Sequence, residues 1–216
     1  MSKKFVLMNN FNENSIQKLL EKLEIQSNLE KTRQINVPPD ERMLAISKDT
    51  GQLIDLILRL LNAKFVLEIG MSVGYSTLWS ANVIQKNLGM ITTIENNPKK
   101  IVMAKNNFSI AGIEKSVEII ENNALDAILS MKNNESFLSH FDFILIDADK
   151  ENIIEYVENV LPLLRIGGII MVDNMLYPEK YSSDMNKLIS YLDTQKNLHF
   201  FTLGVGNGEE IILKIS

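Results

Sequence analysis

The fold is decided by the stretch Phe65-Val66-Leu67-Glu68-Ile69-Gly70-Met71-Ser72-Val73-Gly74-Tyr75. Its apolar, β-branched run ends at a glycine and indicates a buried strand, and residues 75–87 have the pattern of a following helix. The chain therefore turns sharply at Gly70 and Gly74, where the backbone can come close to a ligand. Because Ser72 stands where the dinucleotide fingerprint G-x-G-x-x-G has its second glycine, the turn contains no cradle for a pyrophosphate.

A second acid supports the interpretation of this turn as a binding site. Glu95 ends the next predicted strand and lies about 20 residues past Gly74, the distance at which Rossmann-like folds place a ribose-binding acid. The alternative is a solvated strand end before a helix that begins near Pro98, which Asn97 could cap equally well. We favour an acid that accepts hydrogen bonds from both ribose hydroxyls. The turn and the acid together fit an adenosine-bearing cofactor without phosphates, of which S-adenosylmethionine is the commonest.

Glu68 is a third candidate for cofactor binding. It lies one residue before the end of the predicted buried strand, where a carboxylate needs polar partners. We expect these partners to be the backbone amides of the glycine turn and the amino group of the cofactor.

Strand and helix patterns alternate from residue 65 onward, which indicates a doubly wound α/β sheet. The segment 204–208 between the last two strands is too short for a crossover helix and predicts an antiparallel hairpin at the sheet edge. The fold class is thus α/β, with a seven-stranded, mostly parallel sheet in a Rossmann-like core. The predicted strands are residues 65–69, 90–95, 117–120, 142–147, 167–173, 198–203 and 209–215, and the predicted helices are about 75–87, 98–111, 123–132, 151–164 and 181–194.

Two amphipathic helical patterns precede the sheet, over residues 13–34 and 39–61, with the prolines of Val37-Pro38-Pro39 between them. One interpretation is a cap that packs on the sheet, and the other is a cap that also roofs the substrate site and contributes to a homodimer interface. We expect a single domain, 1–216, with a helical cap over 1–62 and a Rossmann-like core over 63–216, because no linker divides the chain.

Composition excludes several classes of site. The 216 residues include no cysteine, so disulfides, zinc-thiolate sites and thiol nucleophiles are ruled out, and the two histidines, His140 and His199, are expected to be structural. The formal net charge of -5 argues against a nucleic-acid surface. No apolar stretch of about 18 residues and no signal-peptide pattern is present, so we expect a cytoplasmic protein with no membrane partner.

Polar side chains follow two neighbouring predicted strands, as Asp147-Ala148-Asp149-Lys150 and as Asp173-Asn174. In open α/β sheets ligands bind beyond the carboxyl ends of the strands, so both clusters are expected at the crevice that holds the glycine turn. Asp147, Asp173 and Asn174 offer hard oxygen ligands suited to Mg²⁺ or Ca²⁺. The alternative is that such acids only cap the following helices, as Asp149 could.

Three motifs in this order, Glu68-Ile69-Gly70 with Gly74-Tyr75-Ser76, Asp147 to Lys150, and Asp173-Asn174, resemble the caffeoyl-CoA/catechol O-methyltransferase family. The resemblance runs from about Met43 to the C-terminus and implies the class I methyltransferase fold, S-adenosylmethionine as cofactor and dependence on a metal. It places the metal ligands at Asp147, Asp173 and Asn174. It places the cofactor contacts at Ile46, Glu68, Gly70, Met71, Ser76, Glu95, Ala124 and Asp147, to which the turn adds Gly74.

The chain departs from the family pattern at three places. Ile46 replaces a residue that is often Thr in relatives, so only a backbone contact can survive there. Glu95 is one methylene longer than the usual Asp, and Asn122-Asn123-Ala124 stands where relatives often have a glycine. The resemblance therefore implies an altered adenine-binding turn.

The resemblance also implies catalytic roles. Lys150 falls on the lysine that catechol methyltransferases are thought to use as general base, and a nearby divalent cation would disfavour its ammonium form. The alternative is a lysine at a helix start with its head in solvent. With Asp147 and the metal, the implied reaction is an in-line methyl transfer to a hydroxyl of an adjacent pair.

The acceptor is open at this point. The segment 177–184 is shorter than the substrate loop of the plant enzymes, and no run for binding coenzyme A is recognisable. A catechol-like or other small phenolic acceptor is the leading interpretation, and a hydroxyuridine of transfer RNA is the alternative within the family. Two alternatives lie outside this class, a non-catalytic S-adenosylmethionine-binding protein and an NAD-linked dehydrogenase. The strand-end acids argue against the first, and the missing phosphate cradle argues against the second.

Overall fold

The computed structural model describes the backbone of residues 2–216 and the side chains of residues 15–216. One seven-stranded sheet forms its centre, with the strand order β3-β2-β1-β4-β5-β7-β6. The first five strands of this order pair in parallel, and β7 pairs antiparallel with both β5 and β6. The strands are β1 (Phe65–Ile69), β2 (Met90–Glu95), β3 (Val117–Glu121), β4 (Phe141–Ile146), β5 (Leu164–Asp173), β6 (Leu198–Leu203) and β7 (Glu209–Lys214).

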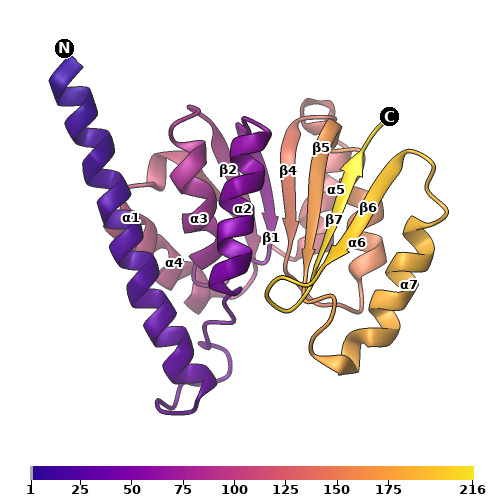
Figure 1. The fold of residues 1–216 in the computed structure, drawn as a ribbon, viewed down its shortest axis with the longest axis horizontal. Helices are drawn as coiled ribbons and strands as arrows, with labels where there is room; N and C mark the ends of the chain where they lie inside the picture. The colour runs from indigo at the N-terminus through magenta and orange to yellow at the C-terminus, as the bar shows by residue number, and fades with distance from the viewer. Residues whose placement is uncertain (1) are drawn as a thin grey trace.

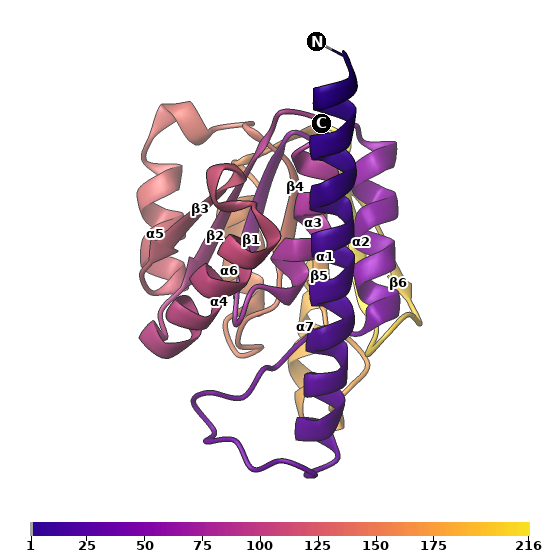
Figure 2. The same cartoon turned by 90° about the vertical axis from the view of Figure 1, so that its left-hand side faces the viewer.

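Helices cover both faces of the sheet (Figures 1 and 2). The apolar side chains of α2, α3 and α4 form one buried cluster with one face of the strands, and those of α5, α6 and α7 form the other. The α1 helix lies outside the first layer, against α3 and α4. The helices are α1 (Ser2–Lys31), α2 (Lys48–Leu60), α3 (Tyr75–Ile84), α4 (Pro98–Ala111), α5 (Ala124–Lys132), α6 (Ile153–Val160) and α7 (Ser182–Leu192), with short 3₁₀ turns η1 (Glu114–Ser116), η2 (Glu135–Phe137) and η3 (Glu179–Tyr181).

The predicted sheet is confirmed, including the terminal hairpin at its edge. The strands at 65–69, 90–95 and 198–203 have the predicted bounds. For the first two the reason is that runs buried on both faces mark parallel strands clearly. The largest difference is β5, which begins three residues before the predicted start at residue 167. The pairing of β4 with β5 shifts register between Phe141 and Phe143, and Gly167 has a φ of 73°. The glycines therefore lie at an irregularity inside β5, where the prediction had them begin the strand.

The helix predicted over residues 39–61 is wrong in its first part. It begins only at Lys48, with Ser47 as N-cap accepting a hydrogen bond from the Thr50 amide at 3.0 Å, and residues 39–47 form a loop. At the other end of the cap, α1 starts well before the predicted residue 13, and its side chains before residue 15 lie outside the described part. The division into a cap and a core within one domain stays a prediction.

Asp142 holds the beginnings of three strands together. Its Oδ2 accepts hydrogen bonds from the amides of Lys64 and Phe65 at 2.7 and 2.9 Å, and its Oδ1 accepts one from Arg165 Nε at 2.6 Å. Burial alone would raise the pKa of Asp142, but the Arg165 guanidinium and the two amides outweigh it and hold the pKa below its ordinary value. The carboxylate is therefore stabilising in its ionised form.

We expect Asp142→Asn to lower the free energy of unfolding at pH 7 by about 1–3 kcal/mol, the range for a charged hydrogen-bond partner. Since the native pKa is lower than the unfolded one, this stabilisation is present above the unfolded pKa of about 3.9 and is lost as the pH falls through the native value. Urea unfolding at pH 7 and at pH 3 measures both effects, with the exposed Asp193→Asn as control. An equal deficit at both pH values would contradict this account.

Candidate active site

A cavity of about 650 Å³ opens at the carboxyl ends of the parallel strands, where an open α/β sheet binds its ligands. It is bounded by the segments that follow β1, β2, β3, β4 and β5, by the loop before α2 and by the hairpin between β6 and β7. The sequence-predicted site residues that line it are Gly70, Glu95, Ala124, Asp147, Lys150, Asp173 and Asn174.

Five predicted cofactor residues do not line this cavity. Ile46, Glu68, Met71 and Ser76 are buried in the layer behind the wall, and Gly74 begins α3. The structure thus brings the strand-end acids into one cavity, whereas these five residues are not part of its lining.

The turn after β1 is built around Gly70. Its φ is 94°, and a Cβ there would lie 2.1 Å from the carbonyl oxygen of Asp147, so only glycine fits. The amides of Gly70 and Met71 donate to the carbonyl of Ile94 at 3.1 and 3.2 Å, and the Asp147 amide donates to Ile69 at 2.9 Å. The turn therefore binds the ends of β1, β2 and β4 together, and at Gly70 the backbone lines the cavity without a side chain.

Glu95 is fixed at the cavity wall by backbone amides. Its Oε2 accepts a hydrogen bond from Ser72 at 2.8 Å, and its Oε1 accepts two from Asn96 and Asn97 at 3.0 and 2.9 Å. Asn97 in turn caps α4 by accepting from the amides of Lys99 and Lys100. The capping role is thus performed by Asn97, and Glu95 is held in one orientation facing the cavity.

Glu68 does not meet the turn as expected. Its Oε2 accepts hydrogen bonds from the hydroxyls of Thr77 and Thr93, both at 2.6 Å, and its Oε1 has no hydrogen-bond partner among residues 15–216. Burial raises the pKa of Glu68. The side chain points behind the turn toward α3, which is why threonine hydroxyls replace the backbone amides as its partners.

The two strand-end clusters meet at the far side of the cavity. Asp173 accepts hydrogen bonds from the amide and the side-chain Nδ2 of Asn174 at 2.8 and 2.9 Å. Burial raises the pKa of Asp147 to about 7, and the charge of Asp173 adds to the rise. Two carboxylates and an amide oxygen are a donor set suited to a hard divalent cation. Within the described residues, no group of three or more His, Cys, Asp and Glu is placed to hold a metal, and this set contains only two.

Lys150 is buried, so the alternative of a solvated lysine at a helix start is wrong. Only 3% of the residue is exposed, and its Nζ lies 3.7 Å from Asp147 Oδ1. No hydrogen-bond acceptor for this Nζ is found in the part of the chain with described side chains. The amine therefore faces the carboxylates with its hydrogen-bonding capacity unused.

Two tyrosines and a proline line another part of the cavity. Tyr177, Pro178 and Tyr181 come from the segment after β5, and Lys180 Nζ lies 4.4 Å from the centre of the Tyr181 ring. Such a wall suits a flat, apolar ring.

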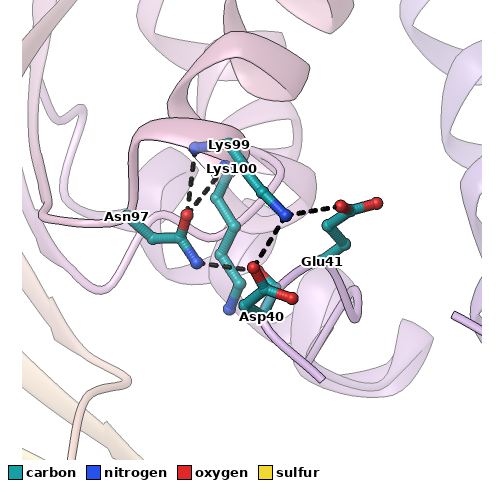
Figure 3. Close-up of polar contacts among 5 residues, drawn as sticks. All are labelled: Asp40, Glu41, Asn97, Lys99 and Lys100. Carbon is teal, nitrogen blue, oxygen red and sulfur yellow. Dashed lines mark hydrogen bonds and ion pairs between the residues drawn. The ribbon is translucent and has the colours of Figure 1, made fainter. Parts of the chain in front are cut away.

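Sequence reasoning missed the contribution of the loop before α2. Leu44 and Ala45 line the cavity, but the helical periodicity around them concealed a loop. Figure 3 shows how this loop is fixed: Lys99 Nζ lies 2.9 Å from Asp40 Oδ2 and 2.8 Å from Glu41 Oε1, and Asn97 Nδ2 donates to the Asp40 carbonyl at 2.7 Å. The start of α4 therefore holds the loop over the site.

Comparison with known proteins agrees with this geometry. A family model described as O-methyltransferase matches residues 17–199. The chain belongs to the O-methyltransferase family. This membership confirms the resemblance to the caffeoyl-CoA and catechol O-methyltransferases and the class I methyltransferase fold.

The individual relatives described next share between 26% and 36% sequence identity with this O-methyltransferase family member. The catechol O-methyltransferase of Niastella koreensis is 36% identical over 133 residues, which cover 62% of this chain and 59% of the relative. The caffeoyl-CoA O-methyltransferase 2 of Populus trichocarpa is 32% identical over 149 residues, covering 69% and 60%. The chain thus spans about three fifths of the length of these curated relatives. The crystal structure of the O-methyltransferase TomG from Streptomyces achromogenes, in complex with S-adenosylmethionine, is 26% identical with a TM-score of 0.76, covering 92% of this chain and 90% of TomG.

Two further features of this family member bear on the earlier expectations. His140 packs among the rings of Phe65, Phe137 and Phe141, in agreement with a structural role. No helix in the described part of the chain combines the length and the apolar character needed to cross a membrane. The cytoplasmic location and the homodimer stay predictions.

We expect Lys99→Met to release the loop before α2, because one ammonium group joins Asp40 and Glu41. The backbone amides of residues 40–45 should then exchange hydrogen for deuterium faster, which mass spectrometry of peptides measures. Lys105→Met is the matched control, since Lys105 pairs with Glu121 on the surface at 2.6 Å, outside the loop. Unchanged exchange in residues 40–45 would show that other contacts hold the loop.

Proposed function

We propose that this protein transfers the methyl group of S-adenosylmethionine to a hydroxyl of a catechol-like or other small phenolic acceptor, with Mg²⁺ or Ca²⁺ held by Asp147, Asp173 and Asn174. The observation that supports this most directly is that one cavity joins the fixed carboxylate of Glu95 to the strand-end carboxylates and to an aromatic wall. The catechol and caffeoyl-CoA methyltransferases among the relatives support the same acceptor class.

We assign the cofactor to the end of the cavity that Gly70, Glu95 and Ala124 line. S-Adenosylmethionine, when bound, supplies a methyl group on a sulfonium. Glu95 would accept hydrogen bonds from the ribose hydroxyls, because three amides already fix its orientation. The bare backbone at Gly70 permits close approach, and Ala124, at the start of α5, would lie against the adenine.

We assign the reaction to the end of the cavity that Asp147, Lys150 and Asp173 line. A divalent cation, when bound, supplies positive charge that favours the ionised form of an acceptor hydroxyl. Asp147, Asp173 and Asn174 would hold it, which would relieve the repulsion between the two carboxylates. Lys150, buried with its Nζ 3.7 Å from Asp147 Oδ1, would in its neutral form take the proton of the hydroxyl. Tyr177 and Tyr181 would orient the acceptor ring.

The competing functions have less support. The comparisons do not support the transfer-RNA alternative, and the net charge of -5 argues against a polyanionic acceptor. Ser72 in place of a phosphate-cradling glycine argues against a dehydrogenase. A non-catalytic cofactor-binding protein does not account for the buried Lys150 and Asp173 beside the partly buried Asp147 at the opposite end of the cavity.

Glu95→Ala should weaken binding of S-adenosylhomocysteine by about 1–3 kcal/mol, the range for hydrogen bonds to a charged group. Titration calorimetry measures this, with NAD as a competing ligand. Glu121→Ala is the matched control, because Glu121 ends the neighbouring strand in register with Glu95 but is exposed and pairs with Lys105. A preference for NAD, or equal losses in the two variants, would refute the cofactor assignment.

Asp147→Ala or Asp173→Ala should abolish metal-stimulated methyl transfer to a catechol while the fold persists, since both groups lie at the carboxyl ends of their strands and line the cavity. S-Adenosylhomocysteine binding should be better preserved in Asp173→Ala, because only Asp147 is also assigned to the cofactor. The assay uses labelled S-adenosylmethionine with and without EDTA, and the exposed Asp126→Ala serves as control. Full activity in EDTA would leave Lys150 alone to remove the proton and would overturn the metal mechanism.

A further inference from the structure

A third buried acid lies beside the two carboxylates of the site. Glu209 begins β7 and pairs with Asp173, the last residue of β5, in the antiparallel ladder. Residues directly opposite each other in such a ladder have Cβ atoms about 4.5–5.5 Å apart, on the same face of the sheet. Glu209 is 0% exposed. Its carboxyl group is therefore confined next to Asp173.

The two oxygens of Glu209 have different surroundings. Oε1 accepts a hydrogen bond from Thr50 Oγ1 at 2.6 Å, and this hydroxyl also contacts Ser47 Oγ at 2.9 Å at the start of α2. Oε2 has no hydrogen-bond partner among the described side chains and backbone groups.

Packing gives no reason for an acid at this position. A buried carboxyl group with one hydrogen bond costs free energy that an apolar side chain in the same strand would not. Glu209 is also not a third member of a ligand cluster, since no three acidic, His or Cys side chains in the described part are grouped for a metal. A role through Asp173 remains, because groups that contact a metal ligand orient it.

We propose that Glu209 is a positioning residue that holds Asp173 in the orientation needed to bind the divalent cation, with Thr50 as its anchor. This inference rests on the proposed metal-dependent function. It also connects the metal-binding end of β5 to the start of α2, directly after the loop that lines the cavity with Leu44 and Ala45.

The next residue supplies a matched control. Glu210 is also 0% exposed, and its Oε2 accepts a hydrogen bond from Thr202 Oγ1 at 2.6 Å, as Glu209 does from Thr50. Because successive side chains of a strand point to opposite faces, Glu210 lies on the other face of the sheet, and it pairs with Val172 instead of Asp173.

The experiment measures Mn²⁺ binding to the full chain by electron paramagnetic resonance, without acceptor, and the thermal midpoint of each variant. Glu209→Leu should weaken Mn²⁺ binding about 10–100-fold, the range for loss of an outer-shell partner. Glu209→Gln should stay near the wild-type affinity, because an amide can accept from Thr50 and donate to Asp173. Glu210→Leu should leave Mn²⁺ affinity unchanged whatever it does to stability.

Other outcomes separate this inference from the proposed function. If the wild type binds Mn²⁺ and Glu209→Leu binds it equally well, the inference is overturned and the metal site stands. If the wild type binds no Mn²⁺, both are overturned. A loss in Glu209→Gln equal to that in Glu209→Leu, or a raised KM for the acceptor with unchanged Mn²⁺ affinity, also overturns the positioning role. Should Glu209→Leu fail to fold, Thr50→Val tests the anchor, and unchanged Mn²⁺ affinity there counts against the proposal.

Discussion

The close approach of the backbone at Gly70 to the end of β4 is the constraint on which the site depends. A side chain at Gly70 would overlap the carbonyl oxygen of Asp147, which a Cβ would approach to 2.1 Å. The amides of the turn instead bond to the end of β2, and the Asp147 amide bonds to the end of β1. One turn therefore fixes three strand ends, and with them the position of Glu95 on one side and of Asp147 on the other. The cavity exists because these ends are held together without side chains between them.

Much of the sheet could be predicted because its determinants are local. Apolar runs such as Phe65 to Ile69 and Met90 to Glu95 are buried on both faces, and a following glycine or acid marks where each one ends. The loop before α2 could not be predicted in this way. Met43 and Ile46 are buried at a helical spacing, but the backbone there is fixed by partners distant in sequence, since the Met43 amide donates to Glu30 and Lys99 holds Asp40 and Glu41. Tertiary contacts override the periodicity at that point.

The same distinction applies to the site. Acids at the ends of parallel strands could be assigned to one crevice from the sequence, because topology alone brings strand ends together. The burial of Lys150 and the position of Glu209 depend on packing across the sheet, and no short motif contains this information. Glu209 follows Gly208, and the sequence there indicates only the second strand of a terminal hairpin. Its relation to Asp173 appears only when β7 is known to insert between β5 and β6.

Acidic groups outnumber basic ones at this end of the cavity. Asp147, Asp173 and Glu209 are neighbours, and Lys150 Nζ lies 3.7 Å from Asp147 Oδ1. Lys150 and Lys100 lower the pKa of Asp147, but burial and the neighbouring acids outweigh them. Negative charge is therefore in excess, and a protein can relieve that excess either by binding protons or by binding a cation with oxygen ligands. The raised pKa values of Asp147 and Glu209 correspond to the first of these routes, and the cation proposed for this site would use the second.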